Sequence, residues 1–118
     1  MTDTGRLTTH VLDTANGHPA RGMTIDLFRV EGGEAVLETS VVTNADGRCD
    51  GPLLAGSALR QGAYRLGFHV GDYYSKINGL RVSFLDVVAV DFRVDDAGAH
   101  YHVPLLVSPY GYSTYRGS

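Results

Sequence analysis

Residues 62–70 read GAYRLGFHV, the stretch in which apolar and polar side chains alternate most regularly. Tyr64, Leu66 and Phe68 fall on one side of an extended chain, and Arg65 falls on the other. An alternation of period two is typical of a β-strand with one buried face and one solvated face. The stretch therefore predicts a half-buried strand and, with its neighbours, an all-β fold.

The same alternation recurs on both sides of this stretch. Further strands are predicted at residues 6–13, 23–30, 35–43, 87–94, 101–107 and 112–116. Turns rich in Gly, Asn and Asp separate them at residues 32–33 and 44–47. One short helix is predicted, with Asp72 as its N-cap, Ile77 in its last turn and Gly79 as its stop. Seven or eight short strands at this spacing predict an antiparallel β-sandwich with one short helix.

Length and charge restrict the class of protein. The 118 residues predict a single domain spanning 1–118, and the 15 glycines predict many turns. The chain carries 13 acidic and 10 basic residues, a net charge of −3, with no basic block. Nucleic acid and anionic membranes require a concentrated basic face, so neither is an expected partner.

The single cysteine, Cys49, cannot form an intrachain disulfide and is too few for a cysteine-based zinc site. It is typical of a reducing compartment. No leader pattern and no stretch near the roughly 20 apolar residues of a membrane span are visible, so a cytoplasmic location is expected.

Two of the five histidines stand out by position. His10 and His102 each lie on the strand face opposite the predicted core, among partly apolar neighbours. Both can be ordinary surface residues, or a second subunit can cover them. Arg48 follows a turn and can be a solvated side chain or a planar donor for a carbonyl or carboxylate oxygen.

Other chemistry is open at this level. His100, His102 and His10 could together form a three-histidine zinc site, although no side chain that would orient these imidazoles by a hydrogen bond is evident. Cys49 beside Arg48 is either a nucleophile of low pKa or, by preference, a small buried thiol. The last eleven residues hold three tyrosines and an arginine, which favours an ordered and functional tail over a disordered end.

Three stretches stand out together: THVLD at residues 9–13, DGR at 46–48, and YHVPLLVSPYGYSTYRGS at 101–118. With these the chain closely resembles the 5-hydroxyisourate hydrolases, the transthyretin-like enzymes of urate catabolism. The resemblance covers essentially the whole chain. The ending YRGS at 115–118 distinguishes these hydrolases from transthyretin, the hormone carrier that shares the fold.

The resemblance implies a transthyretin-like β-sandwich assembled as a homotetramer, a dimer of dimers, with active sites at the ends of a channel between subunits. The implied reaction is hydrolysis of 5-hydroxyisourate to 2-oxo-4-hydroxy-4-carboxy-5-ureidoimidazoline, with no metal and no organic cofactor. The positions that match the family's catalytic residues are His10, Arg48, His102 and Ser118. The positions that match substrate-binding residues are His10, Arg48, Tyr115 and Arg116.

The reaction opens a ring at an amide-like bond, so it needs an activated water, a stabilised oxyanion and a proton for the departing nitrogen. We expect His10 and His102 to share the proton transfers, because imidazole titrates near neutral pH. We expect Arg48 to oppose the negative charge of the attack, and Tyr115 with Ser118 to close the pocket. Two alternative functions remain: a transthyretin-like carrier without catalysis, and a zinc hydrolase.

Overall fold

The structure is a computed structural model that describes residues 4–78 and 83–117. The strands of the first half are β1 (Arg6–Thr8), β2 (Val11–Asp13), β3 (His18–Pro19), β4 (Thr24–Glu31), β5 (Glu34–Val42) and β6 (Leu54–Ala55). The 3₁₀ turn η1 (Gly56–Ala58) follows, then β7 (Gly62–His69) and helix α1 (Val70–Asn78). The strands after the helix are β8 (Val87–Val94), β9 (His100–His102), β10 (Leu105–Val107) and β11 (Tyr112–Thr114).

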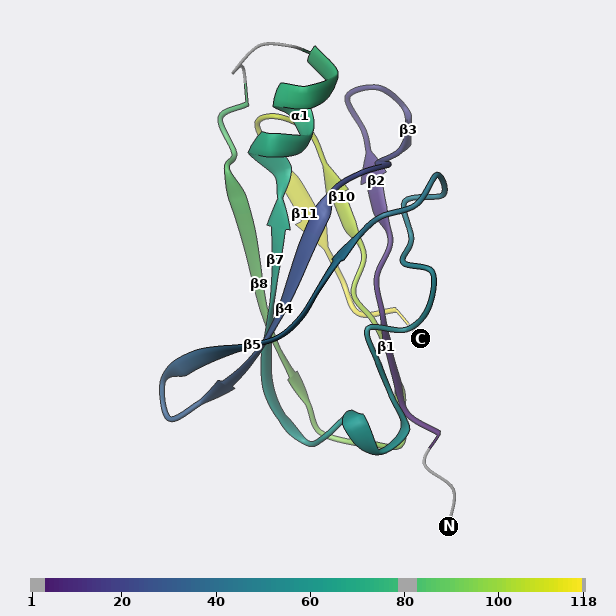
Figure 1. Ribbon diagram of the computed structural model, residues 1–118, viewed down its shortest axis with the longest axis vertical. Helices are drawn as coiled ribbons and strands as arrows, with labels where there is room; N and C mark the ends of the chain where they lie inside the picture. Colours follow the sequence, from purple (N-terminus) through teal and green to yellow (C-terminus); the bar gives the residue numbers. More distant parts are fainter. Residues whose placement is uncertain (1–3, 79–82, 118) are drawn as a thin grey trace.

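These strands form two packed layers (Figure 1). One layer is an antiparallel sheet in the order β5-β4-β7-β8. The other consists of two shorter sheets, β6-β1-β9 and β11-β10-β2-β3. In this second layer β1 runs parallel to β9, and β2 runs parallel to β10. The predicted β-sandwich with one helix is confirmed, and its second layer contains both parallel and antiparallel pairs.

The core lies between the layers, where alternate side chains of each strand meet. Strand β7 confirms the alternation read from residues 62–70: Tyr64, Leu66 and Phe68 are buried, whereas Arg65 is half-buried on the outer face. Opposite them, the buried residues of the second layer include Leu7, Val11, Leu105 and Val107. Burying such side chains supplies most of the favourable free energy of a fold of this kind.

Two predicted strands are each broken into two, so the prediction of continuous strands at 6–13 and 101–107 is wrong. The first splits at Thr9 and His10, and the second splits at Val103 and Pro104. Proline has no N–H to donate to a ladder. The hydroxyl of Thr9 donates to the Val103 carbonyl at 2.7 Å, which satisfies a backbone acceptor at the break. Alternation continues across both breaks, so period alone cannot reveal that the chain changes sheets there.

The helix begins three residues earlier than predicted, at Val70 instead of Tyr73, and Asp72 lies in its first turn instead of capping it. Val70, Tyr73 and Tyr74 are all buried, and their i, i+3, i+4 spacing places them on one helix face. Burial of that face therefore sets the start. The predicted stop at Gly79 lies outside the described residues. No helix in the described part of the chain has both the length and the apolar character required to cross a membrane.

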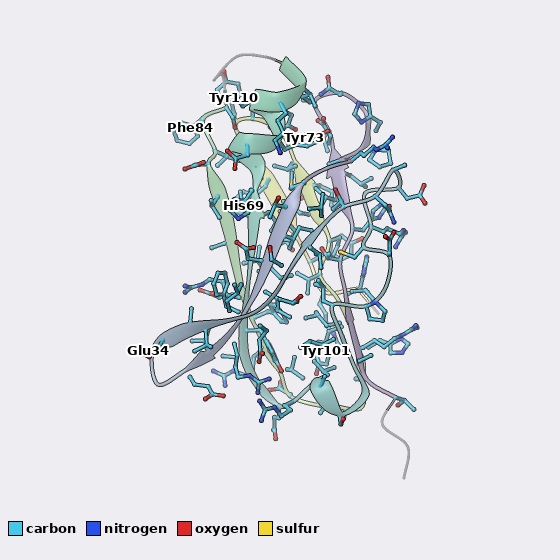
Figure 2. All side chains as sticks on the ribbon, viewed as in Figure 1. Glu34, His69, Tyr73, Phe84, Tyr101 and Tyr110 are labelled. Atoms are coloured by element: carbon cyan, nitrogen blue, oxygen red, sulfur yellow. The ribbon has the colours of Figure 1, made fainter. Side chains whose placement is uncertain are left out.

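The buried carboxylate of Asp13 joins this helix to the second layer. Tyr73 donates to its Oδ2 at 2.8 Å, Tyr74 donates to its Oδ1 at 2.7 Å, and Asn16 Nδ2 donates to its Oδ2 at 2.7 Å. Figure 2 shows Tyr73 pointing from α1 toward the strands. Burial by itself would raise the pKa of Asp13, but the hydrogen bonds from Asn16, Tyr74 and Tyr73 outweigh it and lower that pKa.

Candidate functional site

His102 ends β9, and its imidazole is held by the parallel strand beside it. Thr8 is its register partner on β1, and the Thr8 Oγ1 lies 2.8 Å from Nδ1 of His102. The His102 side chain is half-buried on the outer face, while its neighbour Tyr101 turns into the core. Since Nδ1 is engaged by Thr8, Nε2 is the ring atom left for chemistry.

A tight turn places Arg48 beside His10. The Asn44 Oδ1 accepts hydrogen bonds from the backbone N–H groups of Asp46 at 2.9 Å and Arg48 at 3.2 Å. Gly47 has a φ of +73°, and a Cβ there would lie 2.4 Å from the Val11 carbonyl oxygen, so only glycine fits this position. The backbones of His10 and Arg48 then form an antiparallel bridge. The sequence motif DGR is thus the device that sets Arg48 next to His10.

The His10 ring has a defined orientation. Its Nε2 lies 2.9 Å from the Asp46 carbonyl oxygen. A carbonyl only accepts hydrogen bonds, so Nε2 carries the hydrogen. In the neutral ring the lone pair is therefore on Nδ1, and in the charged ring both nitrogens are donors. The same loop thus positions both Arg48 and the His10 imidazole.

The electrostatics of the site keep His102 neutral. Burial, the positive charge of Arg48 and the proximity of His10 together lower the pKa of His102 below 6.5. A neutral imidazole near pH 7 is competent to accept a proton. The three residues that the sequence singled out, His10, Arg48 and His102, are close enough to influence one another.

The tail reaches the same place. Gly117 N–H donates to the His102 carbonyl at 2.7 Å, and His102 N–H donates back to the Gly117 carbonyl at 3.3 Å. A Cβ on Gly117 would lie 3.0 Å from Cδ2 of the His102 ring, so the tail backbone packs directly on the imidazole. Arg116 donates to the His100 carbonyl at 3.1 Å. The next residue, Ser118, lies outside the described residues.

A pocket of about 320 Å³ opens beside Arg48 and His102. It is lined by Arg6, Thr8, Arg48, His100 and His102. Thr8 and Arg6 were not singled out by the sequence, and His100 was singled out only as a possible zinc ligand. Their signal is the i, i+2 spacing of Arg6 to Thr8 and of His100 to His102, which places each pair on one strand face once the two strands are known to be neighbours.

Two of the predicted residues lie elsewhere within the chain. Tyr115 and Arg116 line a second pocket, of about 260 Å³, beside Tyr101 and strand β8. The Arg116 guanidinium stacks 4.3 Å from the centre of the Tyr101 ring, and Figure 2 shows Tyr101 at the end of the sandwich opposite α1. The chain therefore brings His10, Arg48 and His102 together but does not bring Tyr115 and Arg116 into their pocket.

The geometry of the described residues supports neither of two hypotheses that the sequence left open, a nucleophilic cysteine and a zinc site. Cys49 is half-buried, and burial together with the negative charge of Asp50 raises the pKa of its thiol, which disfavours the nucleophilic thiolate. Among residues 4–78 and 83–117, no three His, Cys, Asp or Glu side chains are grouped to hold a metal ion. What the arrangement offers is a neutral imidazole and a guanidinium, His102 and Arg48, that line one pocket, with the imidazole of His10 beside Arg48.

Comparisons with known proteins agree with this architecture. The model of the HIUase/Transthyretin family matches residues 7–117. The chain is 55% identical to 5-hydroxyisourate hydrolase 2 of Rhizobium meliloti (strain 1021) over 121 residues, which covers 100% of both chains.

Two solved structures are similar as well. The crystal structure of (S)-allantoin synthase matches 100% of this chain with a TM-score of 0.91 and 46% identity, and the chain spans 46% of that protein's length. The 5-hydroxyisourate hydrolase of Klebsiella pneumoniae matches 96% of this chain and 99% of its own, with a TM-score of 0.78 and 38% identity.

Proposed function

Since the chain belongs to the HIUase/Transthyretin family, we propose that the pocket over His102 is the place where it hydrolyses 5-hydroxyisourate. The chain is an enzyme with this hydrolase activity, a step of urate and hence purine degradation. The product is proposed to be 2-oxo-4-hydroxy-4-carboxy-5-ureidoimidazoline.

The observation that carries the site assignment is the state of His102. Its Nδ1 is held 2.8 Å from Thr8 Oγ1, and its pKa is lowered by burial, Arg48 and His10. A general base must be neutral and oriented before it can take a proton. His102 meets both conditions, so His102 Nε2 is proposed to accept the proton of the attacking water.

Arg48 and His10 fill the remaining roles. The oxygen of water adds to the ring carbonyl carbon, and the negative charge that develops there needs a positive partner. Arg48 lines the pocket and supplies that charge. His10 presents Nδ1, because its Nε2 is committed to the Asp46 carbonyl. In its charged form, with a hydrogen on both nitrogens, His10 is proposed to deliver the Nδ1 proton to the departing nitrogen and to regain a proton from solvent.

The tail is proposed to complete the site. Gly117 packs on the His102 ring, which brings the last described residue of the tail to the pocket. This supports a catalytic contribution from Ser118. Tyr115 and Arg116 are proposed to bind substrate in the assembled enzyme, although they line a separate pocket within one chain.

A direct assay tests the function. The ultraviolet decay of freshly generated 5-hydroxyisourate is followed with wild-type protein, with His102→Asn and with His10→Asn. Loss of a positioned acid or base costs about 10²- to 10⁴-fold in rate. His18→Asn is the matched control, because His18 is exposed on β3 away from the pocket. Near-normal turnover by folded His102→Asn would refute the role of His102.

The same assay distinguishes the proposed enzyme from a carrier and from a zinc hydrolase. A carrier would bind the substrate without accelerating its decay. A zinc hydrolase would lose activity after exhaustive chelation, whereas the proposed mechanism predicts that activity survives chelation.

A homotetramer, a dimer of dimers, is proposed as the assembly. Strands β8 and β11 are edges of their sheets, and an unpaired edge is a ready surface for a second copy. Large exposed side chains accompany these edges, including Val87 on β8 and Tyr112 on β11. Light scattering coupled to gel filtration should give four times the chain mass.

The cytoplasmic location expected from the sequence stays a prediction.

A further inference from the structure

The pocket over His102 contains a second basic group that the proposed mechanism does not use. Strands β1 and β9 run parallel in the register Arg6 with His100 and Thr8 with His102. The four side chains form two rungs of a ladder on one face. In the inner rung Thr8 contacts His102, and in the outer rung Arg6 Nε donates to His100 Nε2 at 3.2 Å.

The outer rung fixes the direction of Arg6. Because His100 Nε2 accepts from a guanidinium that can only donate, the His100 ring is neutral in this arrangement and does not repel Arg6. The bond uses one of the five donors of the guanidinium, so the others are available to a ligand. Arg6 is thereby oriented as a planar donor at the rim of the pocket.

The pocket is basic although the whole chain is acidic. Its lining includes Arg6 and Arg48 and no carboxylate, against a net charge of −3 for the chain. Within the described residues, neither arginine forms an ion pair with an acidic side chain. Two guanidinium groups that face one cavity repel each other, and a bound anion relieves that repulsion.

We propose that Arg6, oriented by His100, forms an outer subsite that binds the carboxylate created by ring opening. The inference rests on the proposed function. Water adds its oxygen to the carbonyl carbon, the carbon–nitrogen bond breaks, one proton goes to the departing nitrogen, and the new carboxylic acid releases the other. A group that was neutral in the substrate is therefore an anion in the product. Arg6 lies two residues outward from Thr8 on the same strand, a distance of about 7 Å.

Planar donors suit a carboxylate by forming two parallel hydrogen bonds. Arg48 remains the partner of the oxyanion during the attack, and Arg6 is the partner of the product. Arg6 is accordingly a product-binding residue and not a catalytic one.

The test uses a stable pair of probes that differ only by the carboxylate: orotate, a flat heterocyclic carboxylate, and uracil, the same ring without it. Affinity of each probe is measured by calorimetry for wild-type protein and for Arg6→Gln. Arg6→Gln is expected to weaken orotate about tenfold, the size of one charge-assisted contact at a solvated site, and to leave uracil unchanged. Lys76→Gln is the matched control, since Lys76 is an exposed cation on α1 and its loss changes the net charge equally.

Three outcomes would overturn the subsite: orotate binding unchanged in Arg6→Gln, an equal loss for uracil, or the same loss in Lys76→Gln. Hydrolysis of 5-hydroxyisourate by the wild type is measured separately. If the wild type does not hydrolyse it, the proposed function fails, whereas probe binding still reports whether Arg6 selects a carboxylate.

Discussion

The hydroxyl of Thr8 lies 2.8 Å from Nδ1 of His102, across two parallel strands that are 94 residues apart in sequence. A threonine hydroxyl can donate or accept, so the contact permits either tautomer of the ring. When the hydroxyl accepts from Nδ1–H, Nε2 carries the lone pair that a general base requires. This contact therefore sets the direction of the ring and, in that tautomer, leaves Nε2 free to take a proton.

Replacing Thr8 tests that relationship. Thr8→Val keeps the branched shape and removes the hydroxyl, and we expect kcat to fall about tenfold, the value of one hydrogen bond of about 1.4 kcal/mol. Thr8→Ser keeps the hydroxyl and should retain most of the rate. Steady-state kinetics and thermal melting of both variants provide the check, and equal rates for Thr8→Val and wild type would contradict it.

Arg48 should affect the pH dependence as well as the rate. The pKa of His102 is lowered by burial, then by Arg48 and His10, so protonation inactivates the base at a lower pH than it would for an ordinary imidazole. Arg48→Met removes a charge that opposes protonation, so the acid limb of the kcat/KM profile should move to higher pH. The rate at its optimum should also fall, by about 10²- to 10³-fold if Arg48 stabilises the oxyanion.

Arg48→Lys is the matched variant, because it keeps the charge and loses the planar donors. It should lower the rate but leave the acid limb in place. A limb that moved equally in both variants would show that charge is not the cause.

The lowered pKa of His102 also affects folding stability, because the unfolded state binds a proton at His102 more readily than the folded state does. The contribution of His102 to the free energy of unfolding is therefore complete above pH 6.5, the ordinary pKa, and is lost as the pH falls.

Gly117 should be sensitive because of the ring that it touches. A methyl group there would lie 3.0 Å from His102 Cδ2, so Gly117→Ala requires the imidazole or the tail to move by a few tenths of an ångström. We expect kcat to fall several-fold, since a small misplacement of a catalytic group is costly. In Gly111→Ala the new methyl has no neighbour within 4 Å, and its rate should equal that of the wild type.

Asp13 is expected to govern stability instead of catalysis. Asp13→Ala leaves the hydroxyls of Tyr73 and Tyr74 without their carboxylate in a buried site, which should lower the free energy of unfolding by about 2–5 kcal/mol. Urea denaturation measures the loss. Asp95→Ala, at an exposed position, serves as the control and should change little.

The pH dependence of that stabilisation follows from the pKa of Asp13, which hydrogen bonds lower below 3.8 despite burial. The folded carboxylate binds its proton less readily than the unfolded one. The stabilisation is thus complete at pH values well above 3.8 and disappears as the pH falls through the lowered pKa. Wild type and Asp13→Ala should converge in acid.

Local patterns predicted most of the elements. Residues 62–69 form β7, one residue shorter than the predicted strand, and residues 87–94 match β8 end to end. The predictions were wrong where the structure of a segment depends on contacts with residues that are distant in the sequence. The helix starts at Val70 because its buried face packs on the sheets, and the strands at 6–13 and 101–107 divide because each half joins a different sheet.

For the site, the sequence by itself determined the residue types and the turn. The turn in which Asn44 Oδ1 accepts from Asp46 and Arg48 is local. The bridge between Arg48 and His10, and the Val11 carbonyl that leaves room only for glycine at position 47, come from the tertiary structure. Only the tertiary structure decided that Thr8 supports His102, that Arg6 faces the same pocket, and that Arg116 turns toward Tyr101 instead. Those relationships depend on which strands become neighbours and in which register. Periodicity defines the face of a strand but not its partner, and the partner is selected by burial of the whole core.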